Sequence, residues 1–224
     1  MLLGCSFAQA AATSYIGLEL PAEGPRVPIA SLTKMMTAIV ASRQDLSEAV
    51  EVTKADFDTI KGTRSKLMPG LVVSKNKLLE LALVGSDNRA AFALARSWPG
   101  GREKFIEAMN EEADRLGANA RFTDSAGLGA TNEASSRAVA VIGRELASNK
   151  KLAAFSVEQR ANVGRALWNN TNMYVRTNTL SLEAQKTGFT NEAGSCLYML
   201  LKDGKQLIIL GAKNKYAEAK RLLK

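Results

Sequence analysis

Ser31 and Lys34 are the residues of this chain best placed to do chemistry together. The segment from Pro28 onward predicts a loop that runs into a helix, and residues three apart on a helix share a face, with Cβ atoms about 5–6 Å apart. The helix that follows is apolar nearly all round, which is typical of a buried helix. Burial disfavours an ammonium and makes an amine available as a base. The pair could therefore be a serine nucleophile activated by a lysine. Ser-x-x-Lys is common by chance, however, and by itself it favours a serine cap beside a lysine on an ordinary buried helix.

A second motif, Ser86-Asp87-Asn88, lies in a predicted break between two helices. The first and third residues of such a turn can point the same way, so that Ser86 offers a hydroxyl and Asn88 an amide. A turn of this composition is common, and the motif indicates a site only in combination with others.

A third motif, Lys186-Thr187-Gly188, lies on a predicted strand. Lys186 can supply a cation and Thr187 a hydroxyl for an anionic group. Gly188 leaves room for a bound backbone to lie along an edge strand.

The composition limits the chemistry further. The chain has no histidine among its 224 residues, which excludes Ser-His-Asp and Cys-His catalysis and every histidine-ligated metal site. Its two cysteines are too few for a disulfide framework or a cysteine-rich zinc site. We therefore expect no metal and no cofactor, and a serine nucleophile that uses a base other than imidazole.

In this order along the chain, S-x-x-K, S-D-N and K-T-G are the motifs of penicillin-binding proteins and class A β-lactamases. The segments around them resemble the D-alanyl-D-alanine carboxypeptidase/endopeptidase family of low-molecular-mass penicillin-binding proteins, in particular its type 7, endopeptidase-like branch. These segments are 29–38, 87–91, 98–101, 122–128 and 186–196. The resemblance runs from about Pro28 to Lys224. It implies a serine DD-peptidase that cleaves D-alanyl-linked peptide bonds of peptidoglycan and is inhibited by β-lactams.

The resemblance also implies a role for each residue. Ser31 attacks the carbonyl, Lys34 takes its proton, and Ser86 relays a proton to the leaving amine together with Lys186. The expected substrate-binding residues are Asn88, Lys186, Thr187 and Gly188. Backbone N–H groups of Ser31 and Phe189 form the expected oxyanion hole.

Two alternatives remain open at this point. A class A-like β-lactamase shares the three motifs, and Asp87 is typical of it, but the Glu-x-x-Leu-Asn stretch that such an enzyme needs for deacylation does not occur. A catalytically silent homologue could bind peptidoglycan without cleaving it. Intact Ser31, Lys34 and Lys186 favour an enzyme over the silent homologue.

The elements that must position these motifs follow from hydrophobic periodicity. Helices are predicted over 32–40, 74–84, 88–98, 102–116, 136–148, 151–158 and 214–223, and strands over 14–20, 172–175, 183–188, 195–202 and 206–212. Asp203-Gly204 predicts a hairpin turn between the last two strands. This order predicts an α+β fold: one antiparallel sheet, closed by the N-terminal strand, with flanking helices and a helical subdomain, as in serine β-lactamases and penicillin-binding transpeptidases.

The expected domain organisation is a single catalytic domain over 14–224, preceded by a signal-peptide remnant or an N-terminal strand over 1–13. Leu2-Leu3-Gly4-Cys5 also resembles a lipoprotein box. No apolar run reaches the roughly 20 residues that a spanning helix needs.

The formal net charge of +8 favours an anionic partner, such as a wall polymer or an acidic membrane surface. No cluster of Lys and Arg and no nucleic-acid motif stands out, so we expect no nucleic acid as partner. The family resemblance implies a periplasmic or otherwise extracytoplasmic location in a bacterium, and it leaves membrane association open.

Overall fold

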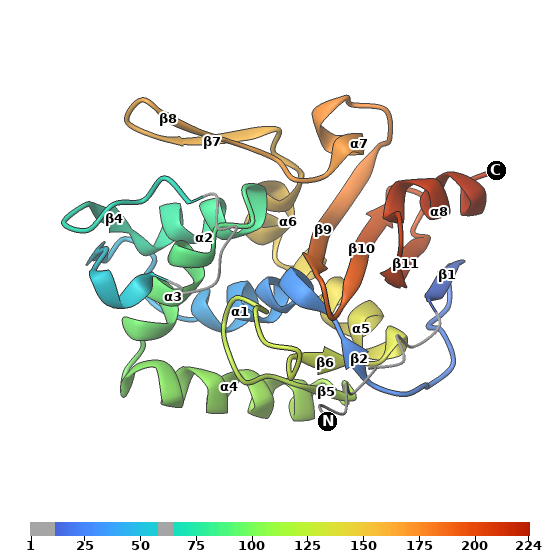
Figure 1. Ribbon diagram of the computed structural model, residues 1–224, viewed down its shortest axis with the longest axis horizontal. Helices are drawn as coiled ribbons and strands as arrows, with labels where there is room; N and C mark the ends of the chain where they lie inside the picture. The colour runs from blue at the N-terminus through green and yellow to red at the C-terminus, as the bar shows by residue number, and fades with distance from the viewer. Residues whose placement is uncertain (1–11, 58–64) are drawn as a thin grey trace, which may run out of the picture.

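A four-stranded antiparallel sheet forms the right side of the molecule in Figure 1, and most of the helices form the left. This computed structural model describes residues 12–57 and 65–224. The strand order is β1-β11-β10-β9. These strands are β1 (Thr13–Gly17), β9 (Leu182–Thr190), β10 (Gly194–Leu201) and β11 (Gln206–Ala212).

The helices of the described residues are α1 (Thr33–Ala41), α2 (Lys75–Val84), α3 (Asn88–Arg96), α4 (Gly101–Arg115), α5 (Ser136–Ser148), α6 (Lys150–Val157), α7 (Met173–Arg176) and α8 (Lys215–Leu222). Two single 3₁₀ turns are η1 (Ala30–Leu32) and η2 (Lys54–Asp56). Among the described residues, no helix combines the length and the apolar character that a membrane span requires.

Three smaller sheets complete the fold. A three-stranded sheet has the order β2-β6-β5, with β2 (Val27–Pro28), β5 (Ala120–Arg121) and β6 (Glu133–Ala134). Two hairpin-like pairs are formed by β3 (Ala49–Glu51) with β4 (Val72–Ser74), and by β7 (Arg160–Val163) with β8 (Ala166–Asn169). The β7–β8 hairpin projects beyond α2 at the top of Figure 1.

The central strands β10 and β11 are buried on both faces. Successive residues of a strand point to opposite sides of the sheet. Tyr198 and Ile208 therefore pack in the cluster that includes α5, whereas Leu197, Met199 and Ile209 pack in a second cluster that includes residues of α7 and α8. Double-sided burial explains why both strands read as continuous apolar runs instead of alternating ones.

Helix α1 is the centre of the helical region, and every one of its residues is buried. It is in contact with α2, α3, α4 and α5, so it has helices on all sides. A helix that is apolar on all sides is stable in such an environment. The first turn of α1 is thereby fixed next to the sheet, as Figure 1 shows.

The predicted α+β fold is confirmed, including the antiparallel sheet closed by the N-terminal strand β1. The hairpin turn between β10 and β11 is also confirmed: Gly204 has φ 85° and the Asp203 carboxylate accepts the Lys205 N–H at 3.0 Å. The signal-peptide remnant or N-terminal strand expected over 1–13 lies, except for its last two residues, outside the described residues.

The strand predicted over 172–175 is wrong, because these residues begin helix α7. Asn172 caps that helix by accepting the Tyr174 N–H at 3.1 Å, and this local bond favours a helical turn over an extended chain. The β7–β8 hairpin was not predicted, and neither were the short strands β2 to β6.

A substitution at Gly143 tests how tightly α5 packs on the sheet. A Cβ at Gly143 would overlap the ring of Tyr198, which is fully buried on β10. Gly→Ala in a helix interior normally stabilises by about 0.5–1 kcal/mol, but here we expect Gly143→Ala to destabilise by about 1–3 kcal/mol because of the overlap. Urea unfolding measures the difference. Gly24→Ala is the control, since a Cβ there would meet nothing within 4 Å; equal stability of the two variants would contradict the packing.

Candidate active site

Ser31 and Lys34 lie together at the junction of η1 and α1, as the sequence predicts. Ser31 is partly exposed on η1, whereas Lys34 is fully buried in the first turn of α1. The Lys34 Nζ lies 2.9 Å from the Ser31 Oγ. This is the geometry required for proton transfer between an alcohol and an amine.

Two further oxygen atoms surround the Lys34 amine. The Nζ donates to the Asn88 Oδ1 at 2.8 Å and to the Ala126 carbonyl at 2.7 Å. Asn88 thus orients Lys34 in addition to the substrate-binding role expected for it. Ala126 was not predicted as a site residue, since a backbone carbonyl leaves no side-chain signature in the sequence.

The loop that carries Ala126 is folded around one carboxylate. Asp124 accepts the N–H groups of Ala126 at 2.7 Å, Gly127 at 2.6 Å and Gly129 at 3.1 Å. An aspartate that collects neighbouring backbone N–H groups is the mechanism of an Asx turn. Asp124 therefore fixes the position of the Ala126 carbonyl, to which Lys34 donates. The sequence Asp124-Ser125-Ala126-Gly127 is the local pattern that could have predicted this turn.

Ser86 and Lys186 form a second hydroxyl–amine pair. The Lys186 Nζ donates to the Ser86 Oγ at 2.8 Å and to the Thr187 carbonyl at 2.9 Å. Lys186 is fully buried. Burial lowers its pKa well below its ordinary range, and the positive charges of Lys34 and Lys215 lower it further.

The remaining predicted residues lie on β9, at the edge of the sheet. The Thr187 hydroxyl donates to the Thr171 Oγ1 at 2.6 Å. A Cβ at Gly188 would lie 3.0 Å from the Ile29 carbonyl oxygen and 3.1 Å from the Ser31 nitrogen. Gly188 therefore allows β9 to approach the Ser31 backbone, as an oxyanion hole shared between Ser31 and Phe189 requires. The Phe189 side chain is 61% exposed.

Asp87, the middle residue of the second motif, has a structural role. Its Oδ1 accepts the Ala90 N–H at 3.0 Å and caps α3, and its Oδ2 accepts the Trp168 indole N–H at 2.7 Å. Asp87 is buried, and both of its carboxylate oxygens accept hydrogen bonds from protein groups. Trp168 was not predicted, because the hairpin that carries it is far away in sequence.

Lys215 adds a third lysine to this region. Its Nζ donates to the Gly188 carbonyl at 3.3 Å, and burial lowers its pKa. Lys34 and Lys215 are both close enough to Lys186 to lower its pKa. Such a concentration of basic groups suits an anionic ligand. Within the described ranges, no group of three His, Cys, Asp or Glu residues could hold a metal ion.

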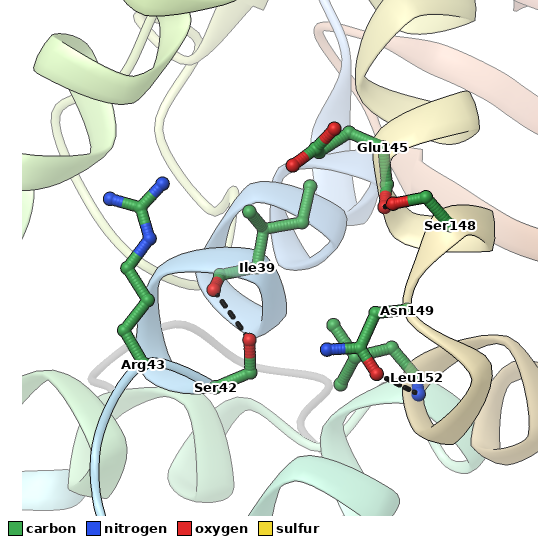
Figure 2. Close-up of a pocket in the computed structure, with 7 residues that line it drawn as sticks. All are labelled: Ile39, Ser42, Arg43, Glu145, Ser148, Asn149 and Leu152. Carbon is green, nitrogen blue, oxygen red and sulfur yellow. Dashed lines mark hydrogen bonds between the residues drawn. The ribbon is translucent and has the colours of Figure 1, made fainter.

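Figure 2 shows a pocket of about 420 Å³ beyond the C-terminal end of α1, at the opposite end from Ser31. It is lined by Ile39, Ser42, Arg43, Glu145, Ser148, Asn149 and Leu152. None of these is a predicted site residue. Its polar groups are engaged locally: Ser42 donates to the Ile39 carbonyl, and Asn149 caps α6 by accepting the Leu152 N–H. The pocket shares no residue with the hydroxyl–amine pairs.

The chain belongs to the D-alanyl-D-alanine carboxypeptidase family, which matches residues 20–214. It is 36% identical over 214 residues to a D-alanyl-D-alanine endopeptidase of Pseudomonas aeruginosa, covering 88% of this chain and 68% of that protein. It is 35% identical over 215 residues to a D-alanyl-D-alanine endopeptidase of Escherichia coli, covering 87% of this chain and 68% of the relative. Among solved structures, penicillin-binding protein 6B of Escherichia coli superposes with a TM-score of 0.81 and 27% identity, covering 90% of this chain and 70% of that one.

A substitution at Gly127 tests the contact between the Asp124 loop and η1. It has φ 77°, and a Cβ there would overlap the Ala30 carbonyl oxygen and lie 2.7 Å from the Thr33 Oγ1. Gly127→Ala should therefore cost more than the roughly 1–3 kcal/mol of a left-handed alanine alone. Gly117→Ala is the matched control, because Gly117 has φ 61° but nothing within 4 Å of an added Cβ. Thermal unfolding compares the two, and equal losses would mean that the loop does not pack against η1 as described.

Proposed function

We propose that this chain is a serine DD-peptidase that cleaves D-alanyl-linked peptide bonds of peptidoglycan through an acyl-enzyme on Ser31. The observation that carries the proposal is the presence of two hydroxyl–amine pairs in a chain without histidine. The Lys34 Nζ lies 2.9 Å from the Ser31 Oγ, and the Lys186 Nζ lies 2.8 Å from the Ser86 Oγ. One pair can activate the nucleophile while the other delivers a proton to the leaving group.

Acylation starts when Lys34, in its neutral form, accepts the Ser31 proton as the Oγ attacks the carbonyl carbon. The C–N bond then breaks, and the leaving amine takes the proton of the Ser86 hydroxyl, which the Lys186 ammonium replaces across its hydrogen bond. A water molecule hydrolyses the resulting ester and regenerates Ser31. Asn88 and the Ala126 carbonyl keep the Lys34 Nζ directed at the Ser31 hydroxyl.

The backbone N–H groups of Ser31 and Phe189 are the proposed donors to the oxyanion. The close approach at Gly188 supports this assignment, because it brings β9 next to the Ser31 nitrogen. A peptide in extended form can add to the edge strand β9 by main-chain hydrogen bonds. Lys186 and Thr187 supply the charge and the hydroxyl for the substrate carboxylate in this proposal.

An endopeptidase preference within this class is favoured by the relatives. The two endopeptidases named above are 36% and 35% identical to this chain. D-alanyl-D-alanine carboxypeptidase DacF of Bacillus subtilis is 28% identical. The β-lactamase alternative gains no support from Asp87, since that carboxylate caps α3 and binds Trp168. The intact hydroxyl–amine pairs argue against a silent homologue.

The proposed substrate places the protein outside the cytoplasm, where peptidoglycan peptide stems are accessible, and makes β-lactams its covalent inhibitors. The net charge of +8 is consistent with attraction to an anionic wall or membrane surface.

The function is tested by removing the nucleophile and the base separately. Ser31→Ala should abolish cleavage of crosslinked muropeptides and labelling by a fluorescent penicillin. Lys34→Arg should lower acylation by at least about a hundredfold, because arginine cannot act as a base. Mass spectrometry of the muropeptide products also separates endopeptidase from carboxypeptidase activity.

Two control variants accompany this test. Ser42→Ala removes a hydroxyl at the other end of α1, and Lys75→Arg alters a buried lysine that pairs with Glu48. Both should retain the parent activity. Cleavage by Ser31→Ala at the parent rate would refute the proposal.

A pH prediction follows from the lowered pKa of Lys186. A lysine with a lowered pKa loses its charge at a lower pH than an exposed lysine. If its cation holds the substrate carboxylate, kcat/KM for a D-Ala-D-Ala peptide should fall as the pH rises through that lowered pKa. Lys186→Arg keeps its charge, so this variant should lose the alkaline fall even if its rate is lower overall.

The matched control is the C-terminal amide of the same peptide, which has no carboxylate to hold. Its kcat/KM should fall less at alkaline pH than that of the acid, because only the proton relay through Ser86 then depends on the Lys186 ammonium. If kcat/KM fell identically with rising pH for the parent and for Lys186→Arg, the Lys186 charge would have no part in substrate capture.

A further inference from the structure

Trp168 lies against the second motif, although it is about 80 residues away in sequence. It is 5% exposed on β8. Its ring packs on Gly85 so closely that a Cβ there would lie 2.5 Å from the Trp168 Cδ1. The indole Nε1 donates to the Asp87 Oδ2 at 2.7 Å. The tryptophan thus contacts the residues on both sides of Ser86.

Ser86 has a backbone conformation that needs such support. Its φ of 54° is in the left-handed region, which a non-glycine residue adopts only when its surroundings hold it there. Asp87 provides the link, because one carboxylate oxygen caps α3 through the Ala90 N–H and the other binds Trp168. The direction of the Ser86 hydroxyl toward Lys186 depends on this turn.

The segment that follows Trp168 contacts the same region. The Thr171 N–H donates to the Val84 carbonyl at 3.1 Å, at the end of α2. The Thr171 Oγ1 accepts from Thr187 at 2.6 Å, on β9. The end of the β7–β8 hairpin and the residues after it therefore lie between the second and third motifs, and Trp168 is the part of this bridge that reaches the Ser86 turn.

We propose that Trp168 is a positioning residue for Ser86, which acts through its hydrogen bond to Asp87. The inference rests on the proposed function, because it concerns the proton that Ser86 transfers during acylation. A ring without an N–H would still cover Gly85 but would leave the buried Asp87 carboxylate without one of its two donors. Hydrogen bonds to ionised groups are among the stronger ones in proteins. The loss should let the turn relax and move the Ser86 Oγ away from Lys186.

This role affects the chemical step more than the first encounter with the ligand. Trp168 is buried against the Gly85–Asp87 turn. Its indole hydrogen bond goes to Asp87, which is not one of the predicted substrate-binding residues. We therefore expect Trp168→Phe to lower the first-order rate of acylation by a fluorescent penicillin by about tenfold. The dissociation constant of the preceding noncovalent complex should change by less than about twofold.

The matched control is the other tryptophan of the chain, Trp98, which packs edge-on against Phe105 with ring centroids 5.4 Å apart. Trp98→Phe should leave both the acylation rate and the dissociation constant unchanged. Loss of labelling in Ser31→Ala, measured alongside, shows separately that the proposed function holds. Acylation of Trp168→Phe at the parent rate would overturn the inference and leave the proposed function intact.

A second variant removes the same hydrogen bond from its other end. Asp87→Asn keeps an oxygen for the Ala90 N–H, so the cap of α3 is preserved, but it no longer offers a carboxylate to the indole. Asp87→Asn should slow acylation as much as Trp168→Phe, and the double variant should be no slower than either alone, since coupled residues are not additive. Independent, multiplying effects would show that Trp168 acts through packing only and would overturn the inference. If Trp168→Phe fails to fold, Asp87→Asn decides alone: an unchanged acylation rate contradicts the inference.

Discussion

The structure depends on a buried amine, the Lys34 Nζ, which connects the start of α1 to two segments far away in sequence. The Lys34 Nζ is bonded to Ser31 on η1, to Asn88 at the start of α3 and to the Ala126 carbonyl in the loop before β6. An amine in a fully buried place is costly unless it is hydrogen-bonded. The segments must therefore converge on Lys34, and their convergence is what directs the amine at the Ser31 hydroxyl. The same hydrogen bonds therefore stabilise the fold and orient the Lys34 amine.

Two glycines allow the backbones to come close enough for this arrangement. Gly127 brings the Asp124 loop against the Ala30 carbonyl, and Gly188 brings β9 against the Ser31 nitrogen. Ser31 therefore lies between the helical region and the edge of the sheet, with backbone from both sides in contact with η1. Around it, the Ser86 hydroxyl accepts a hydrogen bond from Lys186 on β9, and the Thr187 hydroxyl on β9 donates to Thr171, which follows β8. The proposed acyl transfer uses this junction, where helical residues supply the nucleophile and its base, and the sheet supplies the second lysine.

The sequence predicts the parts of the site that have a local signature. The Ser31–Lys34 spacing and the burial of α1 follow from helical periodicity, and the turn at Gly204 follows from Asp-Gly chemistry. The contributions of Ala126 and Trp168 could not be predicted, because one is a backbone carbonyl and the other arrives through long-range packing of a hairpin. Helix α7 was mistaken for a strand because four residues carry little periodicity, and the Asn172 cap decides the conformation.

The proposed function requires that Ser31 becomes acylated while Lys34 serves as its base. Its most direct test is to incubate the protein with benzylpenicillin, digest it, and locate the adduct by tandem mass spectrometry. We expect one penicilloyl group per chain, on the peptide that contains Ser31, and no such group when Lys34→Arg is treated for the same short time. An adduct on another residue, such as Ser86, or no adduct on a folded parent protein, would show that Ser31 is not the nucleophile.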